Sequence, residues 1–195
     1  MGVDQPLAAL SCISEVFSSK RFRTTPLSVL EPILIKFLEL CVTLRKGRTA
    51  KEGLHIYKNV AQNTSVLSVQ VVITNFLDQS KLKLTQALIQ VDSTNQEQVE
   101  DLEASETPES ILKSSVSDLE SSREATYRTI VTPWLRFLWE AYRTALDILR
   151  NNARLEVLYQ VIITSFLCEW TKLTDYFIGR LSSSISILSH PPKKD

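Results

Sequence analysis

Apolar residues recur at intervals of three and four along the N-terminal half of the chain, which is the spacing of amphipathic helices. The polar run SSKRFRTT ends the first predicted helix, whose apolar face comprises Leu7, Leu10, Ile13 (or Ser14) and Phe17. A second helix is predicted from Pro32, because proline is tolerated in the first turn, to Gly47, a plausible C-cap. Its apolar stripe comprises Ile33, Phe37, Leu40, Cys41 and Leu44.

A third helix follows after only a few residues. Thr49 and Glu52 have the spacing of a capping box at its start. Leu54, Tyr57 and Val60 (or Ala61) then share one face. Because the connection KGRT is so short, we expect the second and third helices to pack antiparallel as a helical hairpin.

Ser65 begins a fourth segment whose length and neighbours favour a helix, although its valine and isoleucine content makes a strand locally competitive. The apolar positions at helical spacing are Val69, Val72, Ile73, Phe76 and Leu77. Residues 6–91 are therefore predicted to form N-terminal helical repeats in an all-α fold of stacked antiparallel hairpins.

Between Lys83 and Lys113 the chain has no basic residue and accumulates acidic ones. We interpret residues 92–126 as an acidic linker that buries little. It contains one candidate for a short helix near residues 108–116, where Thr107 would cap and Pro108 would occupy the first position.

Residues 127–160 are predicted to contain a long aromatic helix and the start of the next one. Thr132 and Pro133 would begin the aromatic helix, and Asn151 would end it. Its apolar arc is wide and comprises Trp134, Leu135, Phe137, Leu138, Ala141, Tyr142, Ala145, Ile148 and Leu149. Such an arc is typical of a helix between two layers, and a groove for a partner is the alternative interpretation. Trp139, off the main stripe, is the candidate residue for a partner groove.

Composition limits the function. Lysine plus arginine and aspartate plus glutamate both total 22, so no global basic field indicates nucleic-acid binding. Three well-separated cysteines in apolar stretches are interpreted as buried thiols of a cytoplasmic protein, and no signal peptide or membrane span is expected. His55 and His190 lie far apart, and no zinc spacing or glycine-rich phosphate loop occurs. We therefore expect no enzyme activity, no catalytic residues, no metal and no cofactor.

Two local basic clusters follow predicted helix ends. One comprises Lys20, Arg21 and Arg23; the other comprises Arg45, Lys46, Arg48 and Lys51. Cations near helix C-termini complement the helix dipole and stay solvated, which is one interpretation. Contact with RNA phosphates or an acidic partner is the other. These seven residues are the candidates for RNA or partner contact.

Three segments, Glu31–Val60, Asp101–Ser117 and Thr132–Tyr159, together resemble the N-terminal region of the large "a" subunit of eukaryotic translation initiation factor three. The resemblance implies a TPR-like right-handed solenoid that leads, in the family, into a PCI module ending in a winged helix, which is not expected within this chain. It implies a scaffold that supports assembly, pairs with the c subunit, helps recruit mRNA and contacts the small ribosomal subunit. No membrane or DNA partner is implied.

The resemblance is expected to stop near Gln160, leaving residues 161–195 as a divergent tail. Gln160-Val161 can be encoded as a splice-donor sequence, which suggests a retained intron or a shifted frame. A direct RNA-binding module acting through the basic turns and a truncated fragment without function are the alternatives to the scaffold. A scaffold of a related PCI assembly fits the three segments less well.

Overall fold

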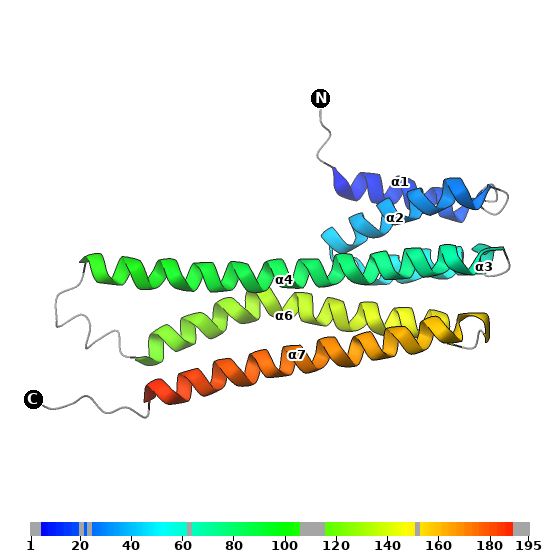
Figure 1. Cartoon of the computed structure of the whole chain (residues 1–195). Helices are drawn as coiled ribbons and strands as arrows, with labels where there is room; N and C mark the ends of the chain where they lie inside the picture. Colours follow the sequence, from blue (N-terminus) through cyan, green and yellow to red (C-terminus); the bar gives the residue numbers. More distant parts are fainter. Residues whose placement is uncertain are drawn as a thin grey trace, which may run out of the picture. The chain divides into compact units, whose positions relative to one another are not determined.

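The computed structural model describes residues 5–19, 22, 25–61, 64–105, 116–150 and 153–188, and these contain helices and no strand (Figure 1). Its contacts divide the chain into two units, Met1–Ile148 and Leu149–Asp195. The first unit holds α1 (Pro6–Ser18), α2 (Leu27–Thr43), α3 (Gly47–Ala61), α4 (Val66–Ser105) and all but the last residue of α6 (Val116–Leu149). The second holds η2 (Ala153–Leu155) and α7 (Glu156–Leu188). The predicted all-α fold class is confirmed.

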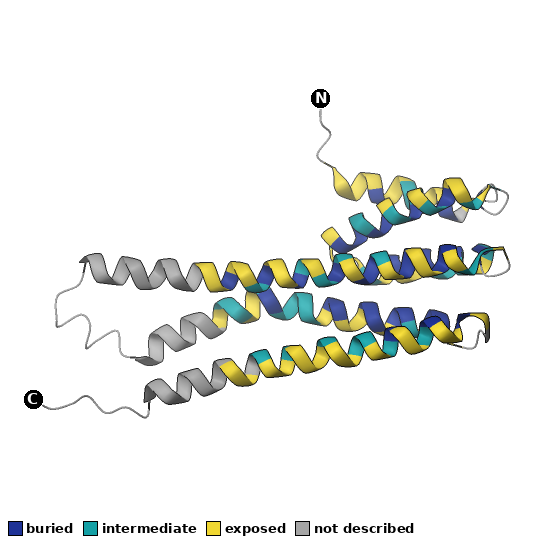
Figure 2. Ribbon diagram, viewed as in Figure 1, coloured by how far each residue is buried: buried dark blue, intermediate teal, exposed yellow. Residues whose placement is uncertain are grey.

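In the first unit, α2 contacts α1, α3 and α4, and the short turn after α2 makes it the partner of α3 in a hairpin. The buried positions line the sides on which these helices meet (Figure 2). Phe37 of α2 is 1% exposed and packs edge-on against Phe17 of α1, with ring centroids 4.6 Å apart. Gly53 of α3 lies against the same Phe37 ring, so three helices meet around one aromatic side chain.

Most predicted core positions are buried, because the helical spacing marks the face that meets a neighbouring helix. All five apolar positions predicted for α4 are buried, as are Leu54, Tyr57 and Ala61 of α3. Leu7 of α1 is the clear exception at 57% exposure. On α2 the prediction missed much of the buried set, which comprises Leu30, Leu34, Phe37, Leu38, Cys41 and Val42.

A polar chain also ties the hairpins together. Tyr57 of α3 donates to the hydroxyl of Ser68 on α4, and Ser68 donates to the Glu31 carboxylate on α2. Burial raises the pKa of Tyr57, and the Glu31 charge adds to this rise while the Ser68 hydrogen bond opposes it. The backbone N–H of Ser68 also donates to the side chain of Ser65, so Ser65 caps α4. The sequence predicted that this segment begins at Ser65 but did not predict the cap.

The predicted helix starts at Pro32 and Pro133 are wrong. Both prolines lie inside longer helices, α2 and α6. Leu30, 2% exposed, and Val131, 0% exposed, precede them. Burying each of these side chains contributes about 1.5–3 kcal/mol, which offsets much of the roughly 3 kcal/mol that an interior proline loses.

The turn between α2 and α3 also differs from the prediction. Gly47 is the first residue of α3 and Thr49 lies within it, so neither the glycine C-cap nor the capping box forms as expected. Instead Arg45 adopts the left-handed conformation with φ 54°. Lys46 N–H bonds Cys41 C=O at 2.8 Å and Arg45 N–H bonds Val42 C=O at 3.0 Å, the hydrogen-bond pattern of a Schellman motif.

Replacing Arg45 with glycine is expected to stabilise the first unit by about 1 kcal/mol, because glycine adopts a positive φ without the steric penalty of a Cβ. The loss of the Arg45 guanidinium from above the Trp134 ring, 5.6 Å from its centroid, reduces this gain. Urea unfolding should therefore show a higher midpoint for Arg45→Gly. Arg48→Gly, the same substitution inside α3, should lower the urea midpoint. A lower midpoint for Arg45→Gly would contradict the expected relief of strain.

The segment predicted to be an acidic linker is helical at both of its ends. Residues 92–105 continue α4, and residues 116–126 belong to α6. The helix continues because α4 already has its register fixed upstream, where Val91 is fully buried. The short helix expected near residues 108–116 lies outside the described residues, except for its last position. The domain division proposed from the sequence stays a prediction.

The second unit consists of η2 leading directly into α7. Leu155, Leu158 and Ile162 are buried, and the Phe166 and Trp170 rings stack with centroids 5.9 Å apart. Much of the segment that the sequence analysis set apart as a divergent tail, from Val161 to Leu188, is therefore helical.

Candidate interaction surface

The basic turn, defined here as Arg45, Lys46, Arg48 and Lys51, is exposed throughout. Two of its cations are held against α6: Arg45 lies over Trp134, and Lys51 Nζ is 2.9 Å from Asp147 Oδ2. Lys46 and Arg48 have no ion pair with any residue in the described part of the chain. Lys46 and Arg48 are therefore the cations of this turn whose charges are available to a partner, and contact of the basic turn with RNA or a partner stays a prediction. Lys20, Arg21 and Arg23 lie outside the described residues.

Asp147 also faces His55, whose Nε2 is 4.0 Å from the same carboxylate oxygen. Partial burial lowers the pKa of His55, the charges of Lys51 and Lys58 lower it further, and Asp147 opposes them. Because these side chains are more than a third exposed, we expect the contact between α3 and α6 to contribute only about 0.2–1 kcal/mol. His55 is half-buried on α3.

The aromatic helix mainly fills the core. Phe137 contacts Phe76 of α4 edge-on at 6.3 Å, and the buried Tyr142 ring lies 5.9 Å from the Lys81 ammonium of α4. Trp139 faces outward and is 45% exposed. The core interpretation therefore holds for the main stripe, while Trp139 stays the candidate for partner contact.

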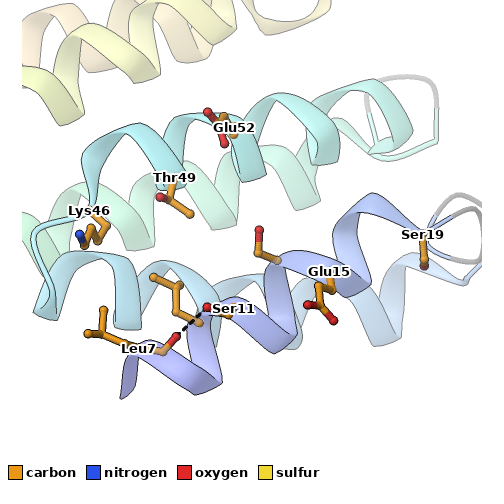
Figure 3. A pocket seen from close by; sticks show the side chains of 9 residues that line it. Leu7, Ser11, Glu15, Ser19, Lys46, Thr49 and Glu52 are labelled. Carbon is orange, nitrogen blue, oxygen red and sulfur yellow. Dashed lines mark hydrogen bonds between the residues drawn. The ribbon is translucent and has the colours of Figure 1, made fainter. Parts of the chain in front are cut away.

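The structure adds two open grooves that the sequence analysis did not anticipate. The first, of about 690 Å³, is lined by Leu7, Leu10, Ser11, Ser14, Glu15, Ser19, Lys46, Thr49 and Glu52 (Figure 3). The second, of about 700 Å³, is lined by Thr25, Pro26, Leu27, Ile56, Asn59, Val60 and Thr64. The recurrence of Leu7, Ser11, Glu15 and Ser19 at intervals of four was the available signal for the first groove, since such residues share one helical face.

The cysteines correct one sequence interpretation. Cys41 is buried, and burial raises the pKa of its thiol to about 12, so it stays protonated at neutral pH. Cys12 and Cys168 are exposed, because each falls on the outer side of its helix. Among the described residues, no group of three or more His, Cys, Asp or Glu side chains lies together as a metal site requires. No described helix combines the length and the apolar character that crossing a membrane needs.

The fold and its surfaces therefore define a class: an all-helical protein of stacked hairpins, with grooves and an exposed basic turn suited to contacts with macromolecules. The chain belongs to the family described as "eIF3a, PCI domain, TPR-like region", whose profile matches residues 1–174. The suspected resemblance is confirmed.

Curated relatives agree with this membership. The chain is 51% identical over 180 residues to the A subunit of eukaryotic translation initiation factor 3 from Mycosarcoma maydis. The proteins of the same name from Coccidioides immitis and Aspergillus clavatus are 47% and 48% identical over 187 residues. Each match covers 90% of this chain and 18% of the relative's length.

The family match corrects the expectation that likeness ends at Gln160, because it continues to residue 174. The suggested retained intron or shifted frame therefore loses its main support for residues 161–174. It stays a hypothesis for the residues that follow.

Proposed function

We propose that this chain acts as a non-catalytic scaffold within eukaryotic translation initiation factor three, in the cytoplasm. The observation that carries the proposal is the family match over residues 1–174, on a fold whose exposed features suit contacts with macromolecules. The relatives carry the name of one component of a factor that has several subunits, and such components assemble with one another. The partners proposed for this chain are the c subunit, mRNA and the small ribosomal subunit.

A tagged pull-down of the chain from a cytosolic lysate, at low and moderate salt with mass spectrometry, tests this function. Recovery of other subunits of the factor at both salt concentrations is the expected result, because contacts that bury apolar surface resist salt. The test variant is Trp139→Ala, which removes the exposed aromatic side chain and leaves the buried stripe of α6 in place; it should recover less of the other subunits if Trp139 contacts a partner. Recovery of chaperones alone from the unaltered chain would contradict the proposal.

Direct RNA binding through the basic turn is the second candidate, and the outward charges of Lys46 and Arg48 favour it. Reversing both, Lys46→Glu with Arg48→Glu, leaves the Arg45–Trp134 and Lys51–Asp147 contacts intact. If the turn binds phosphates, this variant should lose about tenfold or more in affinity for a single-stranded RNA oligonucleotide, with a reduced salt slope. The control reverses two other exposed lysines, Lys36 and Lys172, and should bind like the unaltered chain. Equal RNA binding by all three proteins would remove this candidate.

A further inference from the structure

The first groove has the shape of a binding site for a helix. One wall is α1 with the residue after it, and it contributes Leu7, Ser11, Glu15 and Ser19. The other wall is the start of α3 with the residue before it, and it contributes Lys46, Thr49 and Glu52 (Figure 3). We propose that this groove binds a short amphipathic helix of a partner protein, with basic side chains toward one end of that helix. This inference rests on the proposed scaffold function. It adds the class of structural element that the scaffold binds, an amphipathic helix.

Helical walls favour a helical occupant over an extended one. Residues spaced by three and four on each wall form ridges, and the ridges of a third helix pack between them. From Leu7 to Ser19 the wall is about 18 Å long, which matches roughly three turns of a helix. An extended segment needs hydrogen-bond partners in the groove for its own backbone. The hydroxyl protons of Ser11 and Ser19 are already used, because Ser11 Oγ donates to Leu7 C=O at 3.0 Å and Ser19 Oγ donates to Val16 C=O at 2.8 Å. A helix satisfies its backbone internally.

Apolar and small residues set the face that this helix must present. Leu7 is 57% exposed at one end of the groove, with the buried Leu10 beside it. Ser11, Ser14 and Thr49 are small and line the groove, so another helix can approach closely beside them. An apolar stripe on the bound helix would cover Leu7, whose side chain lines the groove and is exposed in this structure.

The charges along the groove determine where the bound helix carries basic and acidic side chains. Lys46 lies at the end marked by Leu7, whereas Glu15 and Glu52 lie further along on opposite walls (Figure 3). Two carboxylates against one ammonium make the groove acidic overall, which attracts basic side chains and repels phosphate groups. The occupant therefore carries lysine or arginine toward Glu15 and Glu52, and an acidic residue toward Lys46. A nucleic acid does not match this pattern.

The test uses the full chain and a fluorescent designed peptide of four helical turns. The peptide has leucines at intervals of three and four, glutamates at one end and lysines at the other, and fluorescence anisotropy measures its binding. Three further peptides serve as comparisons. One replaces the lysines with glutamates, one replaces the leucines with serines, and one carries a central proline that breaks the helix.

Saturable binding of the first peptide is expected, weakened about tenfold by Glu15→Lys combined with Glu52→Lys, because the reversal turns two attractions into repulsions. Leu7→Asp should weaken it similarly, and both changes lie at exposed positions, so circular dichroism should show an unchanged fold. The control Asp175→Lys, an exposed acidic position on α7, should bind like the unaltered chain. The glutamate, serine and proline peptides should each bind more weakly.

Absence of saturable binding would overturn the inference, as would equal binding of the glutamate or proline peptide. Equal weakening by Asp175→Lys would overturn it too, because binding would then follow net charge and not the groove. If the peptide does not bind while the pull-down still recovers subunits of the initiation factor, the groove inference is wrong and the proposed function stands. If the peptide binds while the pull-down recovers chaperones only, the proposed function fails and the groove stands.

Discussion

Replacing Phe37 with alanine should destabilise the first unit by about 3–5 kcal/mol, the range for truncating a buried phenylalanine. Its side chain is 1% exposed and lies between Phe17 of α1 and Gly53 of α3, so its removal leaves a cavity where three helices meet. Because α1 contributes few other buried side chains, Leu10 and Phe17 among the described ones, the cavity should also loosen α1 from α2. Folding of the unit therefore depends strongly on this one ring.

Urea unfolding followed by tryptophan fluorescence measures the effect. The chain has three tryptophans; Trp134 and Trp139 lie in the first unit and Trp170 in the second, so a Trp170→Phe background makes the signal report the first unit. The control Val29→Ala removes an apolar side chain that is 48% exposed on the same helix and should change stability by less than about 1 kcal/mol. A loss of less than about 1 kcal/mol for Phe37→Ala would show that the ring does not organise the junction.

Replacing Gly53 with alanine should destabilise the same unit by about 1–3 kcal/mol, although alanine is the better helix former by about 1 kcal/mol. A Cβ at this position would lie 2.4 Å from Cε1 of Phe37 and 3.2 Å from two further ring carbons. The ring cannot easily move aside, because it is buried and packs edge-on against Phe17. Close packing should therefore outweigh helix propensity.

Gly47→Ala is the matched control, since it lies in the same helix and its added Cβ would meet its nearest neighbour at an ordinary 3.7 Å. The same fluorescence assay should find Gly47→Ala close to neutral and Gly53→Ala destabilised. Combining Gly53→Ala with Phe37→Leu should give less than the sum of the two losses, because the smaller side chain makes room for the new methyl group. Greater stability of Gly53→Ala than of the unaltered chain would show that α2 and α3 can move apart without penalty.

Helix type and the main buried stripes were readable from the sequence. Val69, Val72 and Phe76 recur at helical spacing and are all buried in α4, despite the strand preference of valine. Periodicity predicts this correctly because a helix has to turn its apolar side toward a neighbour, whichever neighbour that is. The resemblance of three segments to a known family also predicted the TPR-like fold, which the family match confirms.

Helix ends were less predictable than helix faces. Local signals placed starts at Pro32 and Pro133, but the buried side chains of Leu30 and Val131 extend both helices backward past the prolines. At the turn before α3, the expected glycine cap was replaced by Arg45 in a left-handed conformation, where the Schellman hydrogen bonds and the Trp134 contact offset its strain. Tertiary contacts decide such ends because their energies exceed the propensity of any single residue.

The sequence by itself thus determined that this chain folds into helices, which faces of α3, α4 and α6 are mainly buried and to which family it belongs. Only the tertiary structure decided that Cys41 is buried while Cys12 is exposed, and that Glu15 and Glu52, far apart in the chain, line one groove. The difference has a physical reason. Periodicity is a property of one helix, whereas burial and the convergence of charges depend on which helices pack side by side.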